Sequence, residues 1–320
     1  MYSRTLFNTL RLIEWVWMRL LIIVFLAVYV GAARIAFVGD VTLGTCYKHN
    51  QIFDSFAQNN PPEYFLSEAK PYFDSCDLAI ANLETVIADP GLLPIPKRFN
   101  FLGKPEYLEI LTQGGVNTVS VANNHTYDYG QEGFDQTLQN LDRYGIANYG
   151  YEKVLIKEIG GVKIALLSDN GFVYNDSLIS RVSRYKDSVN HVIVSIHWGT
   201  ERMYRPNPLQ MRLSRDLVDA GASLVVGHHP HVLQPVEKYK GRYIVYSLAN
   251  FCFGGNSNPK DKRTILLIAN IDRLQVTLEK VPFRVSSVTH TNDFKPVPVY
   301  GEEALGILNM LKMPTLSITR

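Results

Sequence analysis

The segment RIAFVGDVTLG, residues 34–44, is a β-branched apolar run that leads into an aspartate, Asp40. Further runs of this kind lie at residues 77–81, 117–122, 162–168, 191–196, 223–227 and 242–248. Longer amphipathic segments separate them, and this alternation is typical of an α/β fold. We therefore expect residues 34–320 to form one α/β domain whose strands belong to a single system of sheets.

Helix boundaries between the runs are marked by proline near the start or glycine after the end. These markers predict helices at residues 105–113, 131–143 and 208–220. Beyond residue 264 the sequence changes to the alternating runs ILLIANI, LQVTLEKV and FRVSSV, which predict a terminal antiparallel meander. A closing helix is expected at residues 301–312.

The N-terminal 33 residues differ from the rest. An unbroken apolar run, LLIIVFLAVYV at residues 20–30, follows a basic stretch and precedes the small residues Gly31, Ala32 and Ala33. This pattern predicts a signal peptide at residues 1–33 or an uncleaved membrane anchor. In either case the positive-inside rule places the body in the cell envelope, outside the cytoplasm, as an anchored or a secreted domain.

The charge balance argues against a nucleic-acid partner. Of 32 basic and 30 acidic residues, three arginines and one glutamate lie in residues 1–33, so 29 of each sign remain in the body. A neutral body lacks the basic excess that binds phosphate backbones.

Polar residues able to bind metal or move protons follow nearly every predicted strand. In open α/β sheets, ligands bind at the carboxyl ends of strands, where these side chains would converge. They are Asp40; Asn82 and Glu84; Asn123, Asn124 and His125; Asp169 and Asn170; His197; His228, His229 and His231; and Asn250.

The residue types narrow the chemistry. Carboxylate and amide oxygens mixed with imidazoles suit Zn, Mn or Fe, as one divalent ion or a close pair. Such ions polarise a substrate oxygen and generate hydroxide near neutral pH. For His229 and His231, Pro230 predicts an extended backbone that points both imidazoles to one side and His228 to the other, where it would brace the site or face substrate.

Six ordered blocks carry a family resemblance: GDVTLG (39–44), NLET (82–85), ANNHTYDYG (122–130), HWGTE (197–201), GHHPHVLQPVE (227–237) and YSLANF (246–251). In this order and spacing they resemble the CapA family of capsule and poly-γ-glutamate synthesis proteins. The resemblance covers about residues 34 to 255, and ordered blocks are more specific than a single motif.

The resemblance implies a four-layer α/β/β/α sandwich similar to the calcineurin-like metallophosphoesterases. It also implies six metal ligands, Asp40, Glu84, Asn124, His197, His229 and His231. His125 would be the acid that protonates a leaving group, with Asp128 fixing its tautomer. Asn82, Asn123 and Asn250 are expected to brace the ligands and their loops.

One position departs from the pattern. Metallophosphoesterases commonly begin with Asp-x-His, whereas the second residue after Asp40 is Thr42. One metal position therefore lacks its usual imidazole. Three arrangements stay open: two ions, one ion, or a metal-free acid/base pair of His125 and Asp128.

Other residues are candidates for substrate contact. Lys97 and Arg98 lie in a proline-rich loop and would suit a polyanionic polymer or peptide. Trp198 and Glu201 are expected to line a cleft, with a packing tryptophan and a solvated carboxylate as the equal alternative.

Three functions fit these expectations. The first is an exported metal-dependent hydrolase or transferase of capsule or poly-γ-glutamate synthesis that acts on γ-glutamyl, peptide or phosphoester bonds. The second is a non-catalytic, membrane-anchored partner of a polymer synthase or exporter. The third, a secreted phosphoesterase, follows from fold analogy alone.

Overall fold

The structure is a computed structural model that describes residues 32–46 and 52–313. The predicted signal peptide or anchor lies almost wholly outside the described residues, which begin at Ala32. No helix within the described ranges combines the length and the apolar character needed to cross a bilayer.

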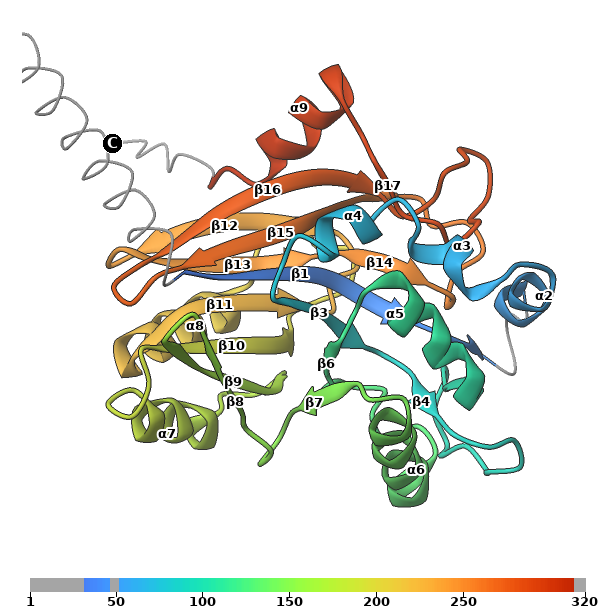
Figure 1. The fold of residues 1–320 in the computed structure, drawn as a ribbon, viewed down its shortest axis with the longest axis horizontal. Coiled ribbons are helices and arrows are strands. Elements are labelled where there is room, and N and C mark those ends of the chain that lie inside the picture. Colours follow the sequence, from blue (N-terminus) through green and yellow to red (C-terminus); the bar gives the residue numbers. More distant parts are fainter. Residues whose placement is uncertain (1–31, 47–51, 314–320) are drawn as a thin grey trace, which may run out of the picture.

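The first sheet is built around β1 (Ala33–Thr42) and has the order β17-β16-β15-β1-β3-β6-β7, with β14 also paired to β1 (Figure 1). The strands β3, β6, β7 and β14 run parallel along this sheet, whereas β15, β16 and β17 form an antiparallel meander. Their bounds are β3 Leu78–Leu83, β6 Thr118–Ser120, β7 Ala147–Tyr149, β14 Asn250–Phe253, β15 Arg263–Ile271, β16 Val276–Arg284 and β17 Val297–Pro298.

The second sheet has the order β12-β13-β11-β10-β9-β8. Its four inner strands run parallel, and the two edge strands are antiparallel to their neighbours. The bounds are β8 Leu155–Ile159, β9 Val162–Gly171, β10 His191–Trp198, β11 Ala222–His228, β12 Leu233–Tyr239 and β13 Arg242–Leu248. A separate small sheet joins β2 (Thr45–Cys46), β5 (Phe101–Gly103) and β4 (Val86–Ile87).

Strand alternation divides the buried residues among the layers. On β1, Ile35 and Phe37 face the second sheet, where they meet residues such as Ile193 and Val226. Ala36 and Val38 face the opposite way, into the helical layer. A strand buried on both faces is a continuous apolar run, which explains why RIAFVG shows no polar alternation.

Helices cover both outer faces (Figure 1). The first sheet is covered by α2 Ile52–Asn59, α3 Pro62–Leu66, α4 Lys70–Phe73, the 3-10 turn η1 Pro105–Tyr107, α5 Leu108–Gly114 and α6 Gly130–Arg143. The second is covered by α7 Asp176–Tyr185 and α8 Pro208–Ala220. The helix α9, Gly301–Met310, contributes Ile307 to the core between the sheets.

The four-layer α/β/β/α prediction is therefore confirmed, and the single system of strands resolves into two sheets packed face to face. The predicted helices and meander are present. The meander differs in one respect, because LQVTLEKV and FRVSSV are not separate strands: β16 continues through Pro282 to Arg284, and residues 285–288 leave the sheet.

Close backbone packing at Gly39 yields the first prediction. A Cβ added there would lie 1.9 Å from the carbonyl oxygen of Ala249, which accepts the N–H of Asp40 at 2.9 Å. We expect Gly39→Ala to lower the free energy of unfolding by about 3 kcal/mol, because rigid backbone must shift. Urea unfolding of the purified chain measures this.

The matched control is Gly306→Ala on α9, where a Cβ would meet no atom within 4 Å. It should raise the free energy of unfolding by about 0.5–1 kcal/mol, since alanine restricts the unfolded chain and favours helix. Equal effects of the two substitutions would contradict the packing argument.

Candidate metal centre and its acid/base pair

Asp40 lies where β1 departs from regular pairing. The register of β1 shifts between Phe37 and Asp40 against β3, and again after Asp40 against β14. Bulges of this kind re-aim a side chain, and the carboxylate of Asp40 is fully buried between the ends of the two sheets. Its Oδ1 accepts the amide of Asn82 at 2.9 Å, and its Oδ2 accepts the backbone N–H of His229 at 3.2 Å.

The electrostatics around Asp40 favour its charged form. Burial alone would raise the pKa of Asp40, but the close imidazoles of His228 and His231, with the charge of His197, hold it well below the usual value. The Nδ1 of His231 lies 3.3 Å from Oδ2, and the Nδ1 of His228 lies 3.5 Å from Oδ1.

Glu84, just beyond β3, is fully buried and has a different environment. Neither of its carboxylate oxygens accepts a hydrogen bond from the residues that the structure describes. Oε1 lies 3.5 Å from the Nε2 of His197 and 3.7 Å from the Nε2 of His125. Burial, and then the charge of Asp40, raise the pKa of Glu84 well above its usual value.

The turn after β11 corrects the expected extended backbone. His229 and His231 have φ values of 94° and 57°, both in the left-handed region. Residues other than glycine adopt this backbone conformation at a cost of about 1–3 kcal/mol each. They keep it only where contacts with the surrounding structure stabilise it. Two hydrogen bonds stabilise the turn. Asp40 accepts the N–H of His229, and the N–H of Arg202 donates to the carbonyl of Pro230 at 2.8 Å.

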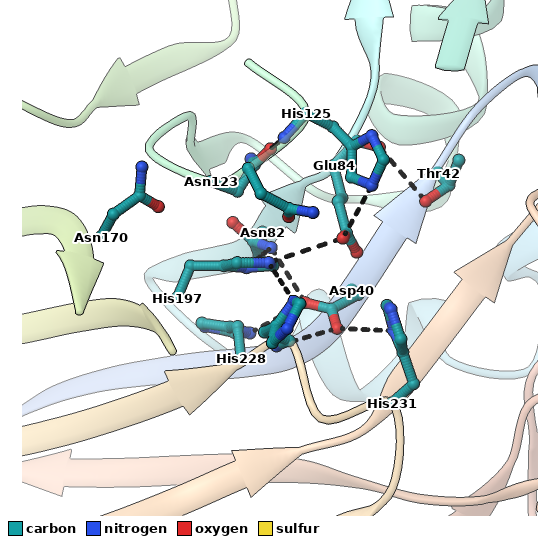
Figure 2. Close-up of polar contacts among 12 residues, drawn as sticks. Asp40, Thr42, Asn82, Glu84, Asn123, His125, Asn170, His197, His228 and His231 are labelled. Carbon is teal, nitrogen blue, oxygen red and sulfur yellow. Dashed lines mark hydrogen bonds and ion pairs between the residues drawn. The ribbon is translucent and has the colours of Figure 1, made fainter. Parts of the chain in front are cut away.

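Imidazoles surround the two carboxylates, among them the labelled rings of His197 and His231 (Figure 2). The Nε2 of His197 lies 3.1 Å from the Nδ1 of His229, and burial lowers the pKa of both, to about 3 for His229. His231 differs: burial opposes its charge, but Glu84 and Asp40 raise its pKa to about 9. Its Nδ1 also lies 2.8 Å from the Oδ1 of Asn250.

This donor set fits a divalent cation. One group consists of Glu84, His197 and His229, and another of Asp40, Glu84 and His231, with the ligand atoms within 4.8 Å of one another in each. Glu84 belongs to both groups. Two carboxylates and three imidazoles around an unpartnered buried carboxylate match the chemistry of Zn, Mn or Fe sites.

His125 stands beside this cluster with an orienting partner. Its Nδ1 lies 2.6 Å from the Oδ2 of Asp128, so Nε2 faces Glu84. Burial lowers the pKa of His125, and the hydrogen bond and charge of Asp128 oppose that effect. The ring of Phe101 packs on the imidazole with centroids 4.4 Å apart, and the backbone N–H of Phe101 donates to Asp128.

The loop after β6 holds His125 in place. Asn123 accepts the backbone N–H of His125 at 2.9 Å and donates to the carbonyl of Leu83 at 2.8 Å. Asn82, in turn, lies 3.2 Å from the Nδ1 of His197 and accepts the hydroxyl of Ser120 at 3.0 Å. The Oδ1 of Asn124 is buried and accepts no hydrogen bond within the described ranges.

Of the residues expected to contact substrate, some are buried against other side chains and others are exposed. Lys97 points inward, donating to Asp128 at 2.7 Å and to the carbonyl of Asn124 at 2.6 Å. His228 is buried beside Asp40 rather than turned toward substrate. Arg98 and Glu201 are exposed.

Trp198 does not line a cleft. Its side chain is 0% exposed, it packs under α8 with Leu213, and its indole N–H donates to the carbonyl of Tyr246 at 2.9 Å. A strand end buried beneath a helix presents no surface to substrate. The packing alternative is therefore the one that the structure supports.

Sequence reasoning missed the aromatic wall of the site. Phe172, 39% exposed, packs edge-on to His229 with centroids 4.7 Å apart, and Phe253 lies 5.1 Å from His231. Phe172 follows the predicted strand at 162–168 after two polar residues and a glycine, and an aromatic residue in such a loop was the available clue. Thr42, the departing position, donates its hydroxyl to the backbone carbonyl of Glu84 at 3.3 Å.

Comparisons with known proteins match the part of the chain that contains the site. A family model described as "Bacterial capsule synthesis protein PGA_cap" matches residues 34–255. The chain is 31% identical over 244 residues to the "PGA biosynthesis protein CapA" of Bacillus subtilis (strain 168), covering 68% of this chain and 62% of that protein. It is 30% identical over 263 residues to the "Capsule biosynthesis protein CapA" of Bacillus anthracis, covering 71% and 62%.

Matches of lower sequence identity also cover about two thirds or more of this chain. A "Probable polyglutamine synthesis accessory protein" of Mycobacterium tuberculosis (strain ATCC 25618 / H37Rv) is 26% identical over 252 residues, covering 66% of each chain. A crystal structure of a Thermus thermophilus protein aligns with a TM-score of 0.43 at 9% identity, covering 76% of this chain and 99% of that one. The two Bacillus relatives are longer than the region they share with this chain, which spans less than two thirds of their length.

The buried indole of Trp198 should contribute to stability. We expect Trp198→Phe to lower the free energy of unfolding by about 3 kcal/mol, because it leaves a cavity and deprives the carbonyl of Tyr246 of its donor. Thermal and urea unfolding measure the loss. Unchanged stability combined with weakened substrate binding would instead support a cleft role for this side chain.

Proposed function

This chain belongs to the bacterial capsule synthesis protein family PGA_cap, and from that premise we propose that it is a metal-dependent hydrolase or transferase of poly-glutamate capsule synthesis. Its substrate bond would be a γ-glutamyl or peptide amide, with a phosphoester as the further candidate. The domain would act in the cell envelope, anchored or released according to the fate of residues 1–33.

One observation carries the proposal: the carboxylate of Glu84 is wholly buried, has no hydrogen-bond donor among the described residues, and lies between the Nε2 atoms of His125 and His197. An uncompensated buried carboxylate costs several kcal/mol, by order of magnitude. A cation shared with the imidazoles removes that cost. A purely structural core would fill the same space with apolar side chains.

The residues that would hold one or two divalent ions are Asp40, Glu84, His197, His229 and His231, with the amide oxygen of Asn124 as a further ligand. When bound, such an ion supplies an electrophile for the substrate oxygen and a hydroxide at neutral pH. Asn82, Asn250 and the backbone N–H of His229 fix the orientation of the ligands.

His125 supplies the proton. In amide hydrolysis the oxygen of water bonds to the carbonyl carbon and the water loses a proton to the Nε2 of His125. The C–N bond then breaks, and the departing nitrogen takes up that proton. We assign this transfer to the Nε2 of His125, because Asp128 holds the Nδ1 proton, leaves Nε2 free to accept, and supports the positive charge of the ring while it carries both protons. Lys97 anchors Asp128 rather than substrate.

A second function has an observation of its own. One mycobacterial relative is named a probable polyglutamine synthesis accessory protein, and the alternative proposal is that this chain acts through a polymer synthase or exporter. In that case the cluster would stabilise the fold, and pull-down of synthase subunits from membranes would survive loss of the cluster. Turnover by the purified chain would exclude a purely accessory role.

Metal content tests the centre directly. We expect purified wild-type chain to contain Zn, Mn or Fe by elemental analysis, and Glu84→Gln to lower its affinity for the ion by a factor of about 100 or more, since a ligand is lost. Equilibrium dialysis against the ion measures the affinity.

Glu237→Gln is the matched control. Glu237 is also a buried glutamate, but it accepts the hydroxyl of Tyr246 at 2.6 Å and pairs with Arg215 at 2.9 Å. Its substitution should leave metal affinity unchanged. Metal-free wild-type protein that stays metal-free on dialysis against all three ions would contradict the proposed centre.

The acid/base pair has a separate test. Asp128→Asn should lower kcat on a γ-linked glutamate oligomer by a factor of about 100 while metal content stays at the wild-type level, because the carboxylate supports the protonated imidazole. Release of free amino groups measures turnover, and a phosphoester panel run in parallel identifies the alternative bond.

Asp54→Asn is the control for this substitution. Asp54 likewise accepts two side-chain hydrogen bonds, from Thr45 at 2.9 Å and Tyr107 at 2.7 Å, but it lies on α2 and touches neither His125 nor the metal ligands. Its substitution should leave kcat unchanged. Full activity of Asp128→Asn would remove His125 and Asp128 from the proposed reaction.

A further inference from the structure

A second concave site lies on the first sheet, at the edge where β1 ends. β15 runs antiparallel to β1, so its first residue, Arg263, is at that edge, and Arg284 at the end of β16 pairs with Arg263. A pocket of about 400 Å³ opens here, lined by Asn258, Lys260, Lys262, Arg284, Val288 and Thr289 together with Pro259.

The pocket contains positive charge with little compensation. Lys260 is exposed, and its ammonium makes neither a hydrogen bond nor an ion pair with any part of the chain that the structure describes. Arg284 has Glu303 as its acidic neighbour, at 3.7 Å from Nε. Asp261 is already engaged by Arg263 at 2.7 Å and by the hydroxyl of Tyr204 at 2.9 Å. None of the described residues that line the pocket is a carboxylate.

Lys262 fixes the shape of the pocket. Its ammonium donates to the backbone carbonyls of Val288 at 3.1 Å and Thr289 at 2.8 Å, and also to that of Thr291. All three of its protons are thereby used, so Lys262 contributes charge and holds residues 288–291 in place. Lys260, Arg284 and the hydroxyl of Thr289 remain as groups that can donate to a ligand.

Two chain segments connect the pocket with the metal cluster. Residues 254–262 connect Phe253, which packs on His231, to the pocket wall. The loop after β10 reaches the same segment, because Tyr204 donates to Asp261, while Arg202 in that loop holds the carbonyl of Pro230 between the two site histidines. The wall of the pocket and the turn that carries the site histidines are therefore connected through residues 253–262 and through the loop after β10.

We propose that the pocket is an anchoring site for carboxylate groups of an acidic chain, whose neighbouring segment reaches the metal cluster. Lys260 and Arg284 bind the carboxylates directly, and the fixed charge of Lys262 supports them. The identity of the chain as the substrate rests on the proposed function, whereas anion binding in the pocket does not. A chain bound at two places would be positioned over the cluster without sequence-specific contacts.

The test uses the full chain and a fluorescein-labelled γ-linked glutamate oligomer. We expect Lys260→Gln to raise the Kd in fluorescence anisotropy about tenfold, the effect of losing one charge-assisted hydrogen bond. The affinity should also fall with added salt less steeply than in the wild type. Arg284→Gln should act in the same direction.

Lys163→Gln is the matched control. Lys163 is an exposed lysine near the start of β9 in the second sheet, outside the pocket, and its side chain pairs with none of the described residues. Equal Kd values for wild type, Lys260→Gln and Lys163→Gln would overturn the proposal. Tight binding of inorganic phosphate with no binding of the oligomer would overturn it as well, by assigning the pocket to phosphate.

Failure of the two proposals can be told apart. Turnover of a γ-glutamyl dipeptide, too short to reach both places, should be the same in Lys260→Gln and wild type if the pocket acts only in anchoring. A chain that binds the oligomer through Lys260 but turns over neither substrate would refute the proposed reaction and keep the anchoring site.

Discussion

The hydrogen bonds of the Asp40 carboxylate connect the two sheets at the edge where the site is formed. One oxygen accepts from Asn82 on β3 of the first sheet, and the other accepts from the backbone of His229 at the end of β11 in the second. A buried carboxylate is tolerated only with such partners. Because the partners come from both sheets, the requirement to satisfy one charge also fixes the relative position of the strand ends.

That constraint explains the strained histidine turn. Left-handed φ values at His229 and His231 cost about 1–3 kcal/mol each, and a free turn would relax to avoid them. The hydrogen bond from His229 to Asp40 and the one from Arg202 to Pro230 stabilise the turn in this form. The result is that three imidazoles and two carboxylates meet in a small buried volume, which no regular strand end would bring about.

The sequence was informative where a residue's position follows from strand direction alone. Parallel strands end at one edge, so Asp40, Glu84, His125, His197 and His231 could be brought together from periodicity and order. It was least informative about side-chain direction. Lys97 looked like a substrate contact because it lies in a loop, but its ammonium turns inward to the carboxylate of Asp128. For Trp198 the sequence left a cleft-lining and a packing role equally open, and only the position of α8 over it decides for packing.

Some features could not be predicted, for physical reasons. The positive φ values after β11 depend on a hydrogen bond between residues far apart in the sequence, so Pro230 alone suggested the wrong backbone. The helix α7 has a local signature, an Asn175 cap with Leu178 and Val182 on one face, and could have been recognised. The pocket around Lys260 depends on the pairing of β15 with β16 and on the hydrogen bonds of Lys262.

The separation of the basic pocket from the metal cluster has a physical rationale. Inside the cluster, water is scarce and each charge interacts strongly with its neighbours, so a further lysine there would compete with a cation for Glu84 and Asp40. At the edge, solvent screens the cations within a Debye length of about 10 Å, and an acidic chain can bind and leave without disturbing the ligands. Lys97 illustrates the distinction, since its charge is tolerated beside the cluster only through its bonds to Asp128 and to the carbonyl of Asn124. Under the proposed function, reaction and recognition require different environments, which the buried cluster and the exposed pocket at the end of β15 would supply separately.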